Sequence, residues 1–478
     1  MRTPNRDILK EFQPVFYPKS IAVVGASSDE TKNGSQFLGA LLQVGYQGAL
    51  YAVSRGGGAS HGLNVHPDLR SIPGPVEYVI ISVPREAVLG VIDDGATKGV
   101  KAVQLFTAGF RESGTEVGRQ LEAELVAKAK RAGIRVIGPN CIGVHNPSMR
   151  ISYGPLPRVG VPGHIGFISQ SGGHGGRLIE LGLDRGINFS KLVSFGNGAD
   201  LDSADFLEYF AADPETKIIG AYLESLNRPQ RFLELARDVS KEKPIVVWKG
   251  GRTDVGAEAA ASHTGALRSS YVVWQAAMAQ AGVITADNLD DLADTLVALE
   301  SIGAAPVRRA AIVSGIGGGG GGESVLGSDT FVGAGLEVPR FTEDTRRAIE
   351  ALLPPIGTIL RNPLDLGGVT PRPAALESVI KLIFADPGID VVVVQEHLNR
   401  LLRNLSPERV RAMNDVMVSA WRGQSKPLVV VAPAWAMTPA SMEVEHTLRE
   451  AGVAVFRSFE AAARSFAKAS AYLARRAA

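Results

Sequence analysis

Short apolar runs recur along the chain, and most of them lead through glycine into an amphipathic stretch. Residues 20–24 precede Gly25, residues 165–169 precede Gly172, and residues 310–314 lead into a glycine-rich segment. Runs of this length that are rich in valine and isoleucine predict buried strands, whereas the stretches between them predict helices. The alternation predicts an α/β fold with parallel sheets covered by helices, whose ligands bind at the carboxyl ends of the strands.

The strand pattern divides the 478-residue chain into three parts. In residues 1–150 the further strand candidates are 49–53, 78–83, 102–106 and 135–137. Their spacing predicts a Rossmann-like domain. Links rich in proline and glycine then introduce two more α/β parts, residues 151–303 and 304–478, and we expect these three ranges to be the domains.

The second and third parts read as divergent copies of each other. The matching segments are residues 210–214 with 383–387, 218–224 with 391–396, and 243–247 with 426–430. After the last matched strand the second part continues into a loop of small residues around His263, whereas the third part has no histidine there. Duplicated scaffolds commonly keep their chemistry in one copy, so the repeat marks the loop around His263 as added function.

Composition and charge narrow the class of protein. Lys and Arg number 50 against 49 Asp and Glu, so no global field favours nucleic acid or an anionic membrane. The first residues lack the apolar core of a signal peptide, and no apolar run approaches the ~20 residues that span a bilayer, so we expect a cytoplasmic protein. The single cysteine, Cys141, excludes an intrachain disulfide and a cysteine-rich metal site, and it is expected to be a buried packing residue.

Two residues of the second part could act together in catalysis. His263 stands among small residues that let another molecule approach its imidazole, and a neutral imidazole is a nucleophile near pH 7. Glu224 follows the apolar run 218–223 and could orient that imidazole by accepting a hydrogen bond. The plain alternative for Glu224 is an exposed glutamate at the end of a strand.

Glycine turns after two predicted strands could bind phosphate. One begins at Gly25 and Ser27, with a further turn at Gly34, Ser35 and Gln36, and the other is formed by Ser171, Gly172 and Gly173. Backbone N–H groups at such strand-to-helix turns bind anions, and ordinary helix caps are the alternative. The first turn lacks the second and third glycines of G-x-G-x-x-G, which argues against a nicotinamide-dependent oxidoreductase.

Together these segments resemble the α subunit of NDP-forming acyl-CoA synthetases, the superfamily of succinyl-CoA synthetase. The resemblance covers nearly the whole chain and is carried by several motifs in order. They include Gly138-Pro139-Asn140-Cys141, Ser169-Gln170-Ser171-Gly172-Gly173, Ser262-His263-Thr264-Gly265 and Asn362-Pro363-Leu364-Asp365. The resemblance implies a Rossmann-like CoA-binding domain followed by two flavodoxin-like CoA-ligase domains.

The resemblance also implies roles for residues. His263 matches the histidine that is transiently phosphorylated, Glu224 the acid that orients it, and Ser171, Gly172 and Gly173 the helix N-terminus that receives the phosphate. The residues that match the family's CoA site are Gly25, Ser27, Gly34, Ser35, Gln36, Val83, Pro84 and Asn140. The chain departs from the family at Ser54-Arg55-Gly56, where Asn-Pro-Lys is usual, so that contact with CoA is not carried over.

In the family the nucleotide is bound by an ATP-grasp module, and three α/β domains already account for this chain. The resemblance therefore implies a separate ATP-grasp β subunit that brings ATP or ADP and Mg²⁺, in a hetero-oligomer that joins CoA to a small carboxylic acid. No metal site is expected on this chain. The alternative is a CoA-binding homologue without catalysis, acting as a regulatory or scaffolding module.

Overall fold

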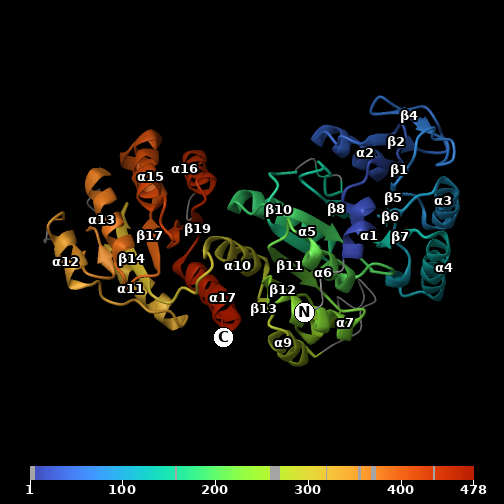
Figure 1. The fold of residues 1–478 in the computed structure, drawn as a ribbon. Helices are drawn as coiled ribbons and strands as arrows, with labels where there is room; N and C mark the ends of the chain where they lie inside the picture. Colours follow the sequence, from blue (N-terminus) through green and yellow to red (C-terminus); the bar gives the residue numbers. More distant parts are fainter. Residues whose placement is uncertain are drawn as a thin grey trace. The chain divides into compact units, whose positions relative to one another are not determined.

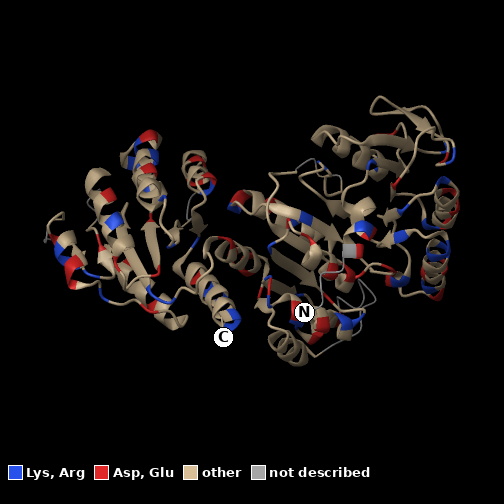
Figure 2. Ribbon diagram, in the orientation of Figure 1, with Lys and Arg blue, Asp and Glu red and all other residues tan. Residues whose placement is uncertain are grey.

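The computed structural model describes residues 6–154, 156, 159–258, 270–318, 320–353, 357–367, 373–433 and 437–477 (Figure 1). The chain forms two compact units, a first unit of Met1–Leu183 with Ile187–Leu289 and a second unit of Asp184–Gly186 with Asp290–Ala478. Within the described ranges, no helix is long and apolar enough to cross a membrane. Acidic and basic residues are interspersed along helices such as α4 (Glu116–Ala132) and α12 (Glu343–Glu350), in keeping with the balanced composition (Figure 2).

The first unit begins with a Rossmann-like sheet in the order β3-β4-β2-β1-β5-β6-β7. Its strands are β1 (Ser20–Val24), β2 (Ala49–Val53), β3 (Ala59–Ser60), β4 (Leu63–His66), β5 (Tyr78–Ile81), β6 (Ala102–Leu105) and β7 (Arg135–Ile137). The helices of this region are α1 (Arg6–Phe16), α2 (Asn33–Val44), α3 (Arg85–Lys98) and α4, with the 3-10 turn η1 (Arg111–Ser113). Strands β1, β5 and β6 are buried along their whole length, which is why they read as continuous apolar runs.

The second sheet of the first unit has the order β13-β12-β11-β9-β10-β8. Its strands are β8 (Gly143–His145), β9 (Ile165–Ser169), β10 (Phe189–Ser194), β11 (Ile218–Leu223), β12 (Ile245–Lys249) and β13 (Ile284–Ala286). Its helices are α5 (Gly172–Arg185), α6 (Ser203–Ala212), α7 (Pro229–Val239) and α9 (Tyr271–Gln280), and α10 (Leu289–Ser301) follows. The chain leaves the first sheet at β7 and enters the second as the antiparallel edge strand β8.

The sheet of the second unit has the order β15-β16-β14-β17-β18-β19. Its strands are β14 (Ala310–Ile316), β15 (Ile359–Leu360), β16 (Leu364–Asp365), β17 (Val391–Glu396), β18 (Leu428–Val431) and β19 (Ala454–Phe456). Its helices are α11 (Gly320–Gly333), α12, α13 (Pro373–Ala385), α14 (Leu398–Asn404), α15 (Pro407–Trp421), α16 (Pro439–Glu450) and α17 (Phe459–Ala477). The five parallel strands follow the order 2-1-3-4-5 in this sheet and in the second sheet, which is the flavodoxin-like order, so the predicted fold class is confirmed.

The two flavodoxin-like sheets also repeat a contact made by a half-buried lysine. Lys243 donates from Nζ to the carbonyl oxygens of Phe210 and Asp213, both at 2.8 Å. In the second unit Lys426 donates to the carbonyls of Phe384 and Asp386, at 2.7 and 2.6 Å. Each lysine Nζ therefore binds carbonyl oxygens at the end of the helix that precedes the third parallel strand. The repeated sequence segments thus form the same contact in both sheets.

One hydrophobic core spans both sheets of the first unit. Phe12 and Phe16 on α1 stack on Tyr209 of α6, with ring centroids 5.1 and 4.4 Å apart. All three rings are almost completely buried, and burying an aromatic side chain contributes about 1.5–3 kcal/mol. Helix α1 therefore ties the first sheet to the second, which fixes the strand ends of the two sheets relative to each other.

The burial of His145 on β8 predicts that the free energy of unfolding depends on pH. His145 is fully buried, and burial lowers the pKa of its imidazole from 6.5 to about 4. As the pH falls below about 6.5 the unfolded chain binds a proton that the folded chain excludes, so the stability due to the neutral ring is lost progressively toward about pH 4. We expect this loss to reach about 3 kcal/mol across that window.

Thermal unfolding followed from about pH 7.5 down to about pH 4.5 tests this expectation. The His145→Gln chain should lose stability less steeply than the wild type over this range, whatever its stability at neutral pH. The control is His446→Gln, because the His446 side chain is 64% exposed, and it should keep the wild-type slope. Equal slopes for the wild type and His145→Gln would contradict the assignment.

Candidate functional site

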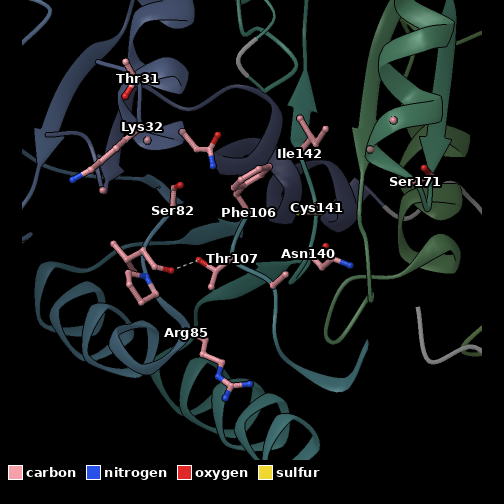
Figure 3. A pocket seen from close by; sticks show the side chains of 18 of the residues that line it. Thr31, Lys32, Ser82, Arg85, Phe106, Thr107, Asn140, Cys141, Ile142 and Ser171 are labelled. Carbon is pink, nitrogen blue, oxygen red and sulfur yellow. Dashed lines mark hydrogen bonds between the residues drawn. The ribbon is translucent and has the colours of Figure 1, made fainter. Parts of the chain in front are cut away.

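A cavity of about 820 Å³ opens where strand ends of the two sheets of the first unit meet (Figure 3). We call it the inter-sheet cavity. Its lining residues are Gly25, Thr31, Lys32, Asn33, Gly34, Ser82, Val83, Pro84, Arg85, Phe106, Thr107, Ala108, Asn140, Cys141, Ile142, Gln170, Ser171, Gly172 and Gly173. In Figure 3 Thr31 and Lys32 lie on one side, Ser171 lies on the other, and Phe106 and Asn140 lie between them.

The turn after β1 packs so closely that two of its positions require glycine. Gly25 has φ +107°, and a Cβ there would lie 2.1 Å from the carbonyl oxygen of Ser82. A Cβ at Gly34 would lie 2.4 Å from the backbone of Gly25. Ser35 Oγ accepts from the N–H of Ser27 at 3.0 Å and donates to its carbonyl at 2.9 Å. The turn is thus fastened to the first turn of α2.

The structure separates the predicted residues of this turn into two groups. Gly25 and Gly34 line the cavity, whereas Ser27, Ser35 and Gln36 are not among its lining residues. The Gln36 amide donates to the carbonyl of Thr31 at 3.0 Å. The side chains of Ser35 and Gln36 therefore hold the shape of the turn, and Ser27 takes part through its backbone.

Val83 and Pro84 separate the inter-sheet cavity from a flanking cavity of about 740 Å³ and line both. Thr107 Oγ1 holds this segment by donating to the carbonyl of Val83 at 2.7 Å. The flanking cavity is also lined by Ser54 and Arg55, where the sequence departs from the family. The two cavities meet at Gly25, Val83 and Pro84, so they can hold different parts of one long ligand.

The second glycine turn faces the same cavity from the other sheet. Ser171, Gly172 and Gly173 line the cavity where α5 begins. A Cβ at Gly172 would lie 2.6 Å from the Ile142 side chain, so the turn packs directly against the segment that links β7 to β8. The first N–H groups of a helix have no partner within the helix, and the helix dipole favours an anion there.

The segment that links β7 to β8 supplies Asn140 and Cys141 to the cavity wall between the two turns. Asn140 has φ +57° and donates its N–H to the carbonyl of Thr107 at 3.0 Å. Cys141 is 2% exposed, and burial raises the pKa of its thiol to about 12. The thiol is therefore protonated near neutral pH and acts as a packing residue, as the sequence predicts.

Glu224 stands at the end of β11 and is buried. Its Oε1 accepts from the Tyr222 hydroxyl at 3.1 Å, and its carbonyl oxygen accepts from Lys249 Nζ at 2.7 Å. Its Oε2 is buried and has no hydrogen-bond partner among the residues that the structure describes. A buried carboxylate oxygen of this kind is ready to accept from a further donor, because leaving it unpaired is costly.

Gln170 joins Glu224 to the cavity, and sequence reasoning did not assign it a role. Its side-chain oxygen accepts the N–H groups of Glu224 at 2.8 Å and Ser225 at 2.9 Å, and its amide donates to Ser225 Oγ at 3.0 Å. Gln170 itself lines the inter-sheet cavity. The contact follows from the register of the folded sheet, in which Ser169 pairs with Tyr222 and the residues after both strands lie side by side, so the sequence carries no signal for it.

His263 lies outside the described residues, between Glu258 and Ser270. The described part of the chain leads to it from Lys249 at the end of β12, next to Glu224. Another histidine, His174, packs its ring against Tyr222 and Trp248 with centroids 4.4 and 4.7 Å apart. Burial lowers the pKa of His174, which makes it a neutral packing group near pH 7.

Three family models match the chain in succession. The CoA binding domain matches residues 19–147, the succinyl-CoA ligase like flavodoxin domain matches residues 162–299, and the Ligase-CoA domain matches residues 312–456. The first two matches contain the two glycine turns of the inter-sheet cavity. The third begins within β14 and covers the rest of the sheet of the second unit.

Relatives and a solved structure agree with these models. The chain is 36% identical over 382 residues to the α subunit of acetate–CoA ligase (ADP-forming) II of Pyrococcus furiosus. The matched segment covers 79% of this chain and 80% of that relative. It is 35% identical over 379 residues to acetate–CoA ligase (ADP-forming) I of Archaeoglobus fulgidus, covering 79% of this chain and 54% of that relative. Dinucleotide-forming acetyl-coenzyme A synthetase 1 of Ca. Korarchaeum cryptofilum, solved with phosphate and ADP, has a TM-score of 0.85 and 33% identity and covers 98% of this chain and 97% of its own. The chain therefore belongs to the family of ADP-forming acyl-CoA synthetases.

Proposed function

We propose that this chain is the CoA- and carboxylate-binding subunit of an ADP-forming acyl-CoA synthetase. One observation carries the proposal: the turns at Gly25 and Gly34 and at Ser171, Gly172 and Gly173 open on the same cavity from two different sheets. One turn can hold CoA while the other holds phosphate, which brings a thiol and an acyl phosphate together. In this proposal the reaction is shared by three domains, residues 1–150, 151–303 and 304–478.

In this proposal CoA lies across the inter-sheet and flanking cavities. Gly25, Gly34, Val83, Pro84 and Asn140 contact it, and Ser27, Ser35 and Gln36 hold the turn in shape. Two adjoining cavities of about 820 and 740 Å³ suit a ligand with an adenine nucleotide at one end and a thiol at the other. Arg55 lines the flanking cavity and places a cation there.

The phosphoryl group is held at the start of α5. The phosphohistidine at His263 transfers its phosphoryl group to a carboxylate, which breaks the P–N bond and forms an acyl phosphate. The CoA thiol, having lost its proton, then attacks the acyl carbon, so a thioester forms and inorganic phosphate leaves. The N–H groups of Gly172 and Gly173 and the hydroxyl of Ser171 stabilise the phosphoryl oxygens, since helix N-termini bind anions without a cationic side chain.

Glu224 positions the histidine. Its unpaired Oε2 accepts one ring N–H of His263, which fixes the tautomer and leaves the other nitrogen free for phosphate. Gln170 keeps the Glu224 backbone in place from the cavity side. The buried contact of Lys249 with the Glu224 carbonyl steadies the same segment.

A second polypeptide supplies the nucleotide. A relative of this chain is named an α subunit, and another is about twice as long as the matched segment, so the remaining module is either separate or fused in the family. We propose a separate ATP-grasp β subunit that binds ATP or ADP with Mg²⁺ and exchanges phosphate with His263 in a hetero-oligomer. The cytoplasm, where CoA and nucleotides are abundant, is the expected location.

Substitution of Glu224 tests the proposed site. We expect Glu224→Gln to slow labelling of the chain by about 10- to 100-fold, the loss typical when the partner that orients a metal-bound histidine is removed, because Glu224 would orient His263 in the same way. The measurement is the initial rate of acid-labile labelling after incubation with radioactive phosphate and a panel of acyl-CoAs. The control is Glu234→Gln on the exposed side of α7, which should label at the wild-type rate.

The same experiment separates the enzyme from a non-catalytic CoA-binding homologue. A homologue of that kind binds CoA but forms no acid-labile phosphate with any acyl-CoA or with an ATP-grasp partner. Unchanged labelling of Glu224→Gln would instead show that the carboxylate does not orient the histidine.

A further inference from the structure

The inter-sheet cavity has an apolar side close to the turn that begins α5. Ile142 and Phe106 both line the cavity, and both are partly buried hydrophobic residues packed against the core of the first unit. In Figure 3 the two side chains lie between Lys32 and Ser171. A ligand group held at Ser171 therefore has an apolar surface next to it.

The Ile142 side chain is wedged between two glycines. A Cβ at Gly172 would lie 2.6 Å from its Cδ1 and Cγ1, and a Cβ at Gly154 would lie 2.2 Å from its Cγ2. The isoleucine thus fills the space that side chains at these two positions would take. In packing this close, the side chain cannot turn aside to make room for a ligand. Ile142 therefore sets a fixed limit to the space beside Gly172.

Phe106 is fixed from behind in a similar way. Its ring packs edge to face on Phe37, with the ring centroids 5.4 Å apart and an interplanar angle of 67°. Phe37 is 2% exposed and belongs to the core of the first unit. Aromatic pairs in this geometry are favourable beyond the area they bury, which holds the Phe106 ring in place.

Charge is absent from this side of the cavity. Among its lining residues that the structure describes, the charged ones are Lys32 and Arg85. Figure 3 shows Lys32 across the cavity from Ser171 and Arg85 well away from Ile142. Arg85 Nε also lies 2.9 Å from Glu86 Oε1. The described lining residues thus place no cation beside Ile142, and a carboxylate there would lack a counter-charge.

We propose that Ile142, together with Phe106, determines the size of the acid, and that this acid is short with an apolar chain. The inference rests on the proposed function, in which Ser171, Gly172 and Gly173 hold the phosphoryl group of the acyl phosphate. A single oxygen joins the acyl carbon to that phosphorus, so the carbon chain begins beside Gly172, where Ile142 packs. A short chain covers the isoleucine, whereas each further carbon meets a side chain that cannot move.

The test compares acyl-CoAs of increasing chain length, from acetyl-CoA to hexanoyl-CoA, on the full chain. The initial rate of acid-labile labelling by radioactive phosphate is measured at low concentrations of each acyl-CoA. We expect the wild type to label faster with acetyl-CoA than with hexanoyl-CoA. Ile142→Ala should raise the ratio of the hexanoyl rate to the acetyl rate by about tenfold or more, because single carbons in an apolar pocket change specificity by about this factor. Ile142→Val should raise the same ratio by less.

Val144 on β8 provides the matched control. Its side chain is 2% exposed and is not among the residues that line the cavity. Val144→Ala removes apolar volume from the neighbouring core, and it should keep the wild-type ratio whatever it does to stability. An equal change of the ratio in Val144→Ala would attribute the effect to loosened packing and overturn the proposal.

Two other results would overturn the proposal while leaving the proposed function intact. One is an unchanged ratio in both Ile142 variants that still label. The other is faster labelling of the wild type with succinyl-CoA than with butanoyl-CoA, which has the same number of acyl carbons and no second carboxylate.

Calorimetric titration with CoA and with each acyl-CoA separates this proposal from the phosphohistidine route. Affinity that falls with chain length in the wild type but falls less in Ile142→Ala would support the acyl site, even if the chain carries no phosphate. Labelling would then have failed because of His263 and not because of Ile142. Failure of the wild type to bind any acyl-CoA would overturn both proposals.

Discussion

The His263→Ala chain is expected to carry no acid-labile phosphate and to lose acyl-CoA synthesis by about a thousandfold or more. The reason is covalent: in the proposed route the phosphoryl group crosses from the nucleotide to the carboxylate on this imidazole, and alanine offers no acceptor. Phosphate labelling of the chain and acyl-CoA formation with an ATP-grasp partner are the two measurements.

A matched control and a half-reaction make this result specific. His164→Ala, at an exposed loop position of the same unit, should label and turn over as wild type. The His263→Ala chain should still interconvert acyl-CoA and inorganic phosphate with acyl phosphate and CoA, because that step uses only the inter-sheet cavity. Labelling of His263→Ala at the wild-type level would show that another residue carries the phosphate.

The Lys191→Met chain is expected to be less stable than wild type by about 3–5 kcal/mol. Lys191 on β10 is fully buried, and its Nζ lies 2.9 Å from Asp213 Oδ2 and 2.7 Å from Glu215 Oε2. Burial alone would lower the pKa of Lys191, yet its hydrogen bonds to Asp213 and Glu215 raise it, so the lysine is charged at neutral pH. Removing the cation leaves the buried Asp213 carboxylate without its counter-charge.

The loss of stability is measured by urea unfolding, with circular dichroism as the signal. Two further variants serve as comparisons. Lys241→Met removes an exposed partner of Asp238, and it should cost less than about 1 kcal/mol. The double variant Lys191→Met with Asp213→Asn should recover part of the loss, because no uncompensated charge then remains in the core. A double variant no more stable than Lys191→Met would contradict the ion-pair explanation.

Much of the fold is predictable from the chain because its central strands are buried on both faces. Residues 20–24 and 78–83, expected as strands, contain the fully buried strands β1 and β5 in the structure. Glycine at position 25 marks a strand-to-helix turn, since only glycine tolerates φ +107° with a carbonyl oxygen so near. The buried Cys141 and the duplicated flavodoxin-like order agree with expectation for the same local reasons.

Contacts of the candidate site join residues that are far apart in the chain. The sequence does not reveal which of these residues meet. Nothing in the pattern places Gln170 on the N–H groups of Glu224 and Ser225, because that contact depends on β9 lying beside β11. The division between Gly25, which lines the cavity, and Ser35, whose hydroxyl fastens the turn, likewise depends on packing. The roles of Glu224 and His263 stay predictions.

The sequence by itself determined the order of strands and helices, the glycine turns and the family to which they point. Only the tertiary structure decided that turns about 150 residues apart share one cavity, that α1 packs its rings on α6, and that Gln170 holds the backbone of Glu224. The physical reason is the range of the interactions. Strand burial and turn geometry are imposed by neighbouring residues, whereas cavities arise from side chains that meet only when the sheets pack together.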